Sequence, residues 1–181
     1  MQEKFVDILD NGEQINVCYL PNKKKVYASS MIVSVLILGF ICAFVALAMF
    51  VPEEGYEPLA PIFCLIPIGI FVAGMILTLV LTHLHLQKSV YAITNKRIII
   101  RTGVIGVDYK CMDLVSIGAT EVYVSVIDKL LGGKTGTIRF GSMASPINGN
   151  NTIPYAFSDI VEPYKTYKFI KEQIELAKSN G

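Results

Sequence analysis

Two long runs without a charged side chain constrain this chain more than any other feature of its sequence. They span residues 26–51 and 59–82 and consist almost entirely of apolar and small residues. A helix needs about 20 such residues to cross a hydrocarbon core about 30 Å thick, and each run is longer than that. Because only a short segment separates the runs, the sequence predicts a hairpin of two transmembrane helices within residues 26–82.

A signal peptide and a buried soluble hairpin both fit these runs less well. A signal peptide is disfavoured because the first run begins only after residue 25 and no A-x-A-type cleavage site follows it. A buried hairpin in a soluble protein is disfavoured by the length of both uncharged runs. Pro61 suits the first turn of the second helix, whereas Pro67 lies inside the span and is expected to kink it. The small residues that favour close helix packing are Ser29, Ser30, Ser34, Gly39, Ala43, Gly69, Ala73 and Gly74.

Basic residues near the ends of membrane helices resist translocation, and here they lie on one side of the predicted hairpin. Those that precede the first run or follow the second are Lys23, Lys24, Lys25, Lys88, Lys96 and Arg97. The connection between the runs carries glutamates and no base. We therefore expect a multi-pass protein of the plasma membrane with both termini in the cytoplasm. Its predicted parts are a cytoplasmic N-terminal segment (1–25), the hairpin (26–82) and a cytoplasmic domain (83–181).

After residue 82 the pattern changes to short β-rich runs separated by turn residues. The runs at 89–94 and 97–102 flank Asn95-Lys96, and a two-residue hairpin is expected there because Asn tolerates positive φ. Glycines at 103 and 106 mark another turn, and a short helical turn is expected before the glycines at 132 and 133. Further strands are expected at 119–126, 137–142 and 152–157. Such regular spacing is typical of an antiparallel barrel or sandwich.

The last segment is predicted to be a helix. Glu162-Pro163 fits a helix start, because proline is favoured in the first turn. Apolar residues then recur at helical spacing, at Pro163, Tyr167, Ile170, Ile174 and Ala177. We expect this stripe to cover the open end of the barrel.

Three stretches of the sequence resemble the bacterial pleckstrin-homology (PH) domain family in its membrane-anchored form. The matching positions are Tyr91, Ile93, Thr94, Asn95, Lys96 and Arg97, then Leu130, Leu131 and Gly132, then Gly136, Thr137 and Ile138. The resemblance covers roughly residues 23–177 and implies two helices ahead of a PH-like barrel. The implied fold is thus a two-helix transmembrane hairpin plus an all-β barrel of about seven antiparallel strands, capped by a C-terminal α-helix. A fold does not by itself give a function, and the eukaryotic namesakes of the family bind phosphoinositides or proteins.

The chemistry-bearing residues give no sign of catalysis. Common phosphate, zinc and acyl-transfer motifs are missing, and the four cysteines lack metal-site or disulfide spacing. His83 and His85, if on a strand, would share one face, but no third metal ligand is evident, so a structural or interfacial role is favoured. A net charge of +1 disfavours nucleic-acid binding. We therefore expect no cofactor, no metal, no nucleic-acid partner and no enzymatic activity.

Basic residues near the first hairpin are the candidate ligand-binding site. Arg97 and Arg101 lie on one face of a strand, with Lys96 at the hairpin tip, and eukaryotic PH domains use basic residues there to hold phosphate groups. Lys129 and Lys134 could add to general attraction toward an anionic leaflet. The alternative is a solvated basic rim without a ligand, in which Arg97 stabilises the turn. A second candidate surface, on the last helix, comprises Tyr164, Lys165, Tyr167, Lys168 and Lys171.

The sequence favours a non-enzymatic, membrane-tethered interaction module. Its expected partners, besides the lipid bilayer, are a protein, a second copy of the chain or anionic lipid. The alternative is a component of a small oligomeric transporter or channel. Transport pathways often need an ionisable residue within the membrane, and neither run contains a charged one.

Overall fold

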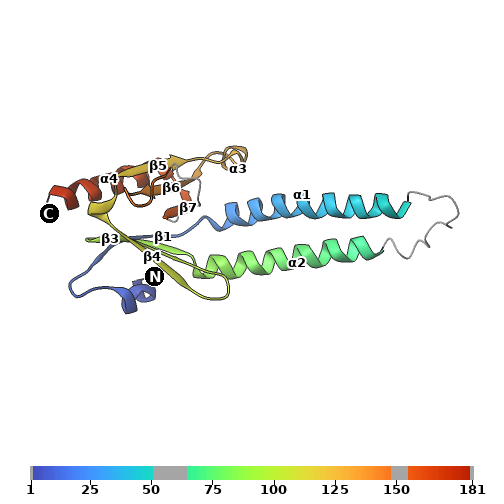
Figure 1. Cartoon of the computed structure of the whole chain (residues 1–181), viewed down its shortest axis with the longest axis horizontal. Coiled ribbons are helices and arrows are strands. Elements are labelled where there is room, and N and C mark those ends of the chain that lie inside the picture. Colours follow the sequence, from blue (N-terminus) through green and yellow to red (C-terminus); the bar gives the residue numbers. More distant parts are fainter. Residues whose placement is uncertain (1, 51–64, 148–154, 180–181) are drawn as a thin grey trace. The chain divides into compact units, whose positions relative to one another are not determined.

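The computed structural model describes residues 2–50, 65–147 and 155–179. Its contacts divide the chain into two compact units (Figure 1), one formed by Met1–Val26 with Leu84–Gly181 and the other by Tyr27–His83. The first unit is called the folded domain below, and the second the helical hairpin. The first turn of the first long helix and the last turn of the second belong to the folded domain.

Two helices dominate the hairpin, α1 (Lys23–Phe50) and α2 (Leu65–Lys88). Both are long and apolar enough to cross a membrane, and only 6% and 11% of the residues in their apolar windows are buried. Large side chains such as Leu36 and Phe40 are mostly exposed, as lipid-facing residues would be. Helix α2 continues past the predicted end at residue 82 to Lys88. Its predicted start, with Pro61, lies outside the described residues, and the predicted kink at Pro67 stays a prediction.

Small and hydroxylated side chains join the two helices of the hairpin. A Cβ atom on Gly74 would lie 2.7 Å from Leu38 Cδ1, so a larger residue there requires the Leu38 side chain to shift. Ser34 Oγ and Thr78 Oγ1 are 3.1 Å apart and share a hydrogen bond. These contacts confirm the expected close packing at Ser34 and Gly74, whereas a Cβ atom on Gly39 or Gly69 would meet nothing within 4 Å.

Four strands form the first sheet of the folded domain, in the antiparallel order β1-β2-β3-β4. Their bounds are Ile15–Tyr19, Val90–Thr94, Arg97–Thr102 and Asp108–Asp113. The predicted β2–β3 hairpin is confirmed, with Ile93 paired to Ile98. Its turn has no positive φ at Asn95; instead the Thr94 hydroxyl accepts hydrogen bonds from the backbone N–H groups of Lys96 (3.1 Å) and Arg97 (2.9 Å).

Three strands form the second sheet, in the antiparallel order β5-β6-β7. Their bounds are Ala119–Tyr123, Thr135–Gly141 and Ala156–Val161. The expected helical turn is α3 (Val126–Leu130), and positive φ angles at Gly132 and Gly133 end it. Strand β7 lies four residues later than predicted, because the apolar residues that pair with β6 continue through Ile160.

The main core lies between the two sheets and the last helix, α4 (Pro163–Ser179). Phe157 is its centre, with the rings of Tyr91 and Phe140 each 4.9 Å away between centroids. From α4, Ile170 is fully buried and Ile174 is 6% exposed, which confirms the predicted apolar stripe. Each such side chain contributes about 1.5–3 kcal/mol by burial.

A second cluster covers the other face of the first sheet. The N-terminal 3-10 helix η1 (Gln2–Ile8) places Phe5, which is fully buried, against Val90, Ala92 and Ile99. Strand β2 is therefore buried along its whole length, because both faces of the sheet are covered. This explains why its sequence lacks an apolar–polar alternation.

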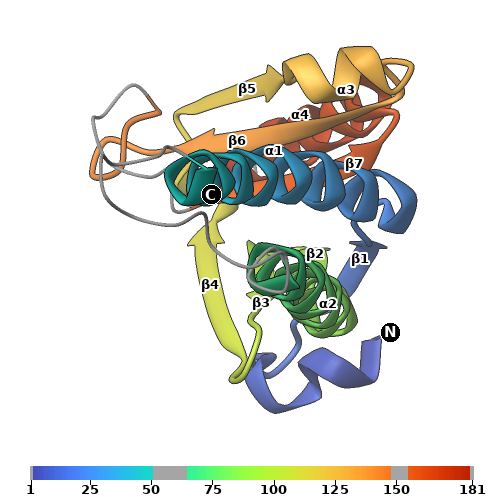
Figure 2. The same cartoon turned by 90° about the vertical axis from the view of Figure 1, so that its right-hand side faces the viewer.

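Strand β1 alters the predicted domain organisation. It pairs with β2, with Tyr19 opposite Tyr91, although the whole hairpin separates the two strands in the sequence. Figure 2 shows β1 beside β2 at the edge of the sheet away from β4. Residues 1–25, expected to be a separate segment, thus belong to the folded domain together with 84–181. The described strands number seven, as expected, but they form two separate sheets and no closed barrel.

Candidate functional site

Arg97 is bound by the N-terminal segment of its own chain. Its Nε donates to Glu13 Oε1 (3.0 Å), and its Nη2 donates to Glu13 Oε2 (2.8 Å) and to the backbone oxygen of Ile8 (2.8 Å). Asp10 Oδ2 lies 3.4 Å from the same nitrogen. A guanidinium with this bidentate carboxylate partner has few donors left for a phosphate.

The carboxylate that holds Arg97 is buried. The Glu13 side chain is completely inaccessible, and it also accepts hydrogen bonds from the Thr94 hydroxyl (2.7 Å) and the Asp10 N–H (2.9 Å). Burial alone would raise the pKa of Glu13, but the hydrogen bonds, that from Arg97 first, hold it below its ordinary value. Glu13 therefore stays ionised at neutral pH and fastens the N-terminal segment to β3.

Arg101 is engaged at the other end of β3. Its Nη1 donates to the backbone oxygen of Lys88 (2.8 Å), the last residue of α2, and its Nε donates to the Tyr109 hydroxyl (3.2 Å). Lys4 Nζ donates to the neighbouring oxygen of Gln87 (3.0 Å). Two cations thus satisfy carbonyl groups at the C-terminus of α2, where the helix dipole favours positive charge.

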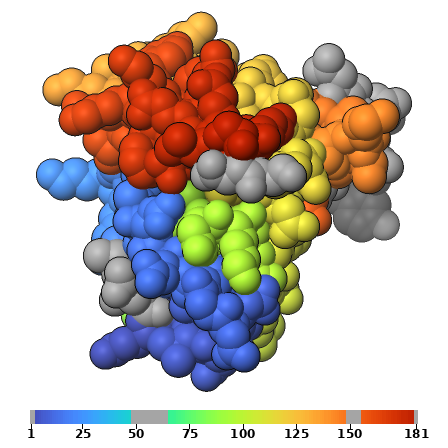
Figure 3. Space-filling view, turned by 90° about the vertical axis from the view of Figure 1, so that its left-hand side faces the viewer, coloured from blue at the N-terminus to red at the C-terminus, as the bar shows by residue number. Residues whose placement is uncertain are grey.

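The three predicted ligand-binding residues do not converge on one pocket. Arg97 and Arg101 lie about 13 Å apart along the strand, on the same face as Ile99, which belongs to the cluster that Phe5 fills. Lys96 is exposed at the β2–β3 turn. Because β2 begins just after Lys88 and ends at Thr94, the β2–β3 turn is at the end of the sheet opposite to Lys88. Figure 3 shows the domain face that holds this turn, with the N-terminal residues and α4 on either side. These contacts give both arginines a structural role, and lipid binding by the three residues stays a prediction.

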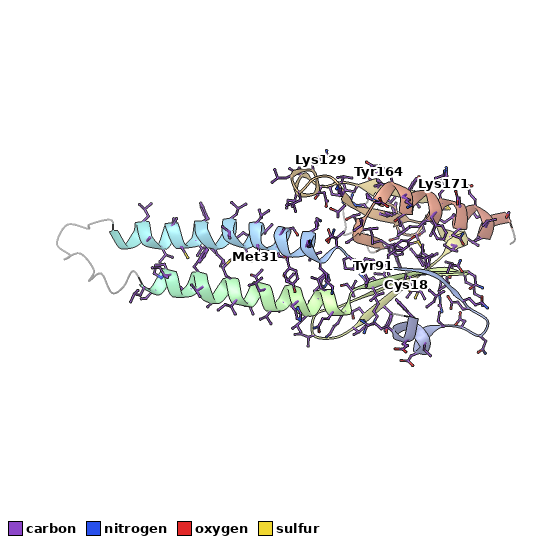
Figure 4. All side chains as sticks on the ribbon, turned by 180° about the vertical axis from the view of Figure 1, so that it is seen from behind. Cys18, Met31, Tyr91, Lys129, Tyr164 and Lys171 are labelled. Carbon is purple, nitrogen blue, oxygen red and sulfur yellow. The ribbon has the colours of Figure 1, made fainter. Side chains whose placement is uncertain are left out.

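The second candidate surface and the two histidines lie on helices. Tyr164 is 67% exposed on α4, and Figure 4 shows it with Lys171 on the outer side of the domain, whereas Tyr91 points between the sheets. His83 and His85 lie on α2 and not on a strand, so they do not share one face. His83 Nδ1 is 2.8 Å from the Tyr27 hydroxyl, and within the described residues no group of three metal-ligating side chains occurs.

A buried ion cluster, which the sequence patterns did not reveal, holds the start of α1. Lys25 Nζ contacts Asp128 Oδ1 on α3 (3.2 Å) and Asp159 Oδ1 on β7. Asp128, at 1% exposure, also accepts hydrogen bonds from Ser125 and Thr135. Burial would raise the pKa of Asp128, but these hydrogen bonds and the lysine keep it below its ordinary value. Lys23 and Lys24 remain exposed, so only the third lysine of the run is built into the fold.

The first turn of α1 and the last turn of α2 are therefore held by contacts within the folded domain. In the comparison with protein families, the model for the bacterial PH domain matches residues 28–174. The chain belongs to the bacterial PH domain family. This PH-family match begins within α1 and ends within α4, so it includes the hairpin as well as strands β2 to β7. No curated protein and no solved structure is significantly similar to the chain.

Proposed function

We propose that this PH-family protein is a non-enzymatic interaction module of the plasma membrane, with both termini in the cytoplasm. One observation carries the proposal: the apolar hairpin is inserted between β1 and β2, two strands that pair with each other. A domain built on both sides of its own anchor cannot separate from the membrane by bending a single linker. Its binding surfaces are thereby kept at the membrane face.

A protein partner or a second copy of the chain is the binding partner that the contacts favour. Arg97 and Arg101, which would have held a lipid headgroup, are occupied by Glu13 and by the end of α2. The outer face of α4 offers Tyr164, and its neighbour Lys165 has a side chain that is 85% exposed. Tyrosine is enriched at protein interfaces because it combines a large apolar surface with a polar tip.

Photo-crosslinking in membranes tests the proposal. A photoreactive residue replaces Tyr164 in the full chain, expressed in its source organism, and the matched control replaces Met143, which is fully exposed in the loop after β6. We expect a discrete adduct at position 164, with the mass of a partner protein or of a dimer. No adduct at 164, or the same adducts from both positions, would contradict binding through α4.

A further inference from the structure

The folded domain carries exposed apolar side chains on two protruding elements. On α3 and directly after it, Val126 is 79% exposed, Leu130 is 76% and Leu131 is 43%. On the turn between β3 and β4, Ile105 is 92% exposed. Single exposed apolar residues are ordinary, so the position and rigidity of these elements decide what they mean.

Helix α3 lies where α1 begins. Asp128 points into the domain and binds Lys25, one residue before the uncharged run starts. Val126 and Leu130, four residues apart, share the side of α3 away from that buried carboxylate. A capping box formed by Ser125 and Asp128 fixes the first turn of the helix. Helix α3 is thus held in place beside the start of α1, and its apolar side faces away from Lys25.

The β3–β4 turn lies where α2 ends. Lys88 Nζ donates to the backbone oxygens of Val104 (2.7 Å) and Ile105. The turn is tight, because Gly103 has a φ of 151° and a Cβ atom there would lie 2.3 Å from the Gly106 oxygen. Ile105 is therefore presented on a fixed loop that the last residue of α2 holds directly.

The exposed apolar side chains of α3 and of the β3–β4 turn are treated below as one surface. We propose that α3 and the β3–β4 turn insert Val126, Leu130 and Ile105 into the lipid headgroup region, as a peripheral contact beside the two membrane helices. Within the folded domain, α3 contacts Lys25 and the β3–β4 turn contacts Lys88, the lysines nearest to the two apolar runs in the sequence. The inference rests on the proposed membrane anchorage, and it adds a lipid surface to the protein-binding face of α4.

The bilayer is the occupant that the chemistry of this surface favours. Both elements contact residues at the ends of the apolar helices, so chain connectivity brings them to the membrane surface. Exposed lysines accompany the apolar side chains, namely Lys23, Lys24, Lys129 and Lys134. Apolar residues flanked by lysines match the headgroup boundary of an anionic leaflet.

Single tryptophans make the contact measurable, because the chain has none of its own. The variants Ile105→Trp and Leu130→Trp are made in the full chain and reconstituted in vesicles of phosphatidylcholine and phosphatidylglycerol, with and without brominated acyl chains. Leu176→Trp, at an exposed apolar position of α4, is the matched control. Leu36→Trp, within α1, reports the anchorage itself.

We expect blue-shifted emission and bromine quenching at positions 36, 105 and 130, and neither at 176. Quenching at 36 without quenching at 105 and 130 would overturn this inference and leave the anchorage intact. A blue shift at 105 and 130 that depends on protein concentration but not on bromine would assign the surface to a second copy. No quenching at position 36 would refute the proposed anchorage, and the lipid contact with it.

Discussion

The ion pair between Arg97 and Glu13 gives the sharpest test of how the folded domain is held together. In Arg97→Ala, the inaccessible Glu13 carboxylate loses both hydrogen bonds from the guanidinium and keeps only those from Thr94 and the Asp10 N–H. Removing one partner of a buried pair costs about 3–5 kcal/mol. Because the Arg97 side chain is 19% exposed, we expect the lower end, about 3 kcal/mol.

Hydrogen exchange in detergent micelles measures this loss locally. The amide protons of η1 and β1 should exchange faster by about two orders of magnitude, since 1.4 kcal/mol corresponds to a factor of ten. The matched control is Arg139→Ala, because Arg139 forms only a loose ion pair with Glu121 at 3.8 Å and stacks on Tyr123. Such exposed pairs contribute about 0–1 kcal/mol.

The pH dependence of this hydrogen exchange is a second test of the ion pair. The pKa of Glu13 is lower in the folded chain than in the unfolded one. The stability that ionised Glu13 gives to the folded state is therefore fully present above the unfolded pKa. It is lost as the pH falls through the folded pKa. Glu13→Gln should remove this acid-dependent loosening. Equal protection in Arg97→Ala and Arg139→Ala, or unchanged acid sensitivity in Glu13→Gln, would refute the assigned role.

Three further outcomes follow from the structure. Lys25→Met should destabilise the packing of α3 by about 2 kcal/mol, because buried Asp128 loses a charged hydrogen-bond partner. Proteolysis at α3 should therefore increase in Lys25→Met and stay unchanged in Lys24→Met. Equal proteolysis of the two variants would contradict the buried cluster. Gly74→Leu should lower the aggregation temperature in micelles because of the contact with Leu38. Gly69→Leu should not lower it, because a Cβ atom there meets nothing within 4 Å. A larger decrease for Gly69→Leu than for Gly74→Leu would refute the contact between Gly74 and Leu38. Trypsin should cleave the folded domain in inverted membrane vesicles and spare it in sealed right-side-out ones, while the opposite pattern would reverse the proposed topology.

Local sequence patterns predicted the elements whose signals are local. The uncharged runs indicated α1 and α2, the glycine pair at 132 and 133 indicated the end of α3, and helical spacing placed Ile170 and Ile174 in the core. The end of α2 was predicted too early because His83 and the residues after it lower the hydropathy without breaking a helix. Polar residues of this kind continue a helix readily once its backbone hydrogen bonds are formed.

The features that sequence reasoning missed depend on partners far along the chain. Strand β1 is five residues long and of mixed polarity, and its partner β2 follows only after the hairpin. The sequence identified Arg97 as a notable base, but nothing local reveals that Glu13 is its counter-ion. Strand pairs and ion pairs between residues far apart in the sequence leave no periodic pattern in the local sequence.

The insertion of the hairpin between β1 and β2 sets an order for biogenesis. When β1 leaves the ribosome, its partner is still about 70 residues from being made, which is a delay of roughly 4–14 s at typical rates of synthesis. In the proposed topology, the intervening residues enter the bilayer before Tyr19 pairs with Tyr91. Until then the nascent N-terminal segment is an unpaired strand, which is a template for wrong pairing. In the proposed topology, completion of the first sheet follows insertion of the hairpin. Variants that delay membrane insertion should accordingly accumulate as chains with an unprotected N-terminus.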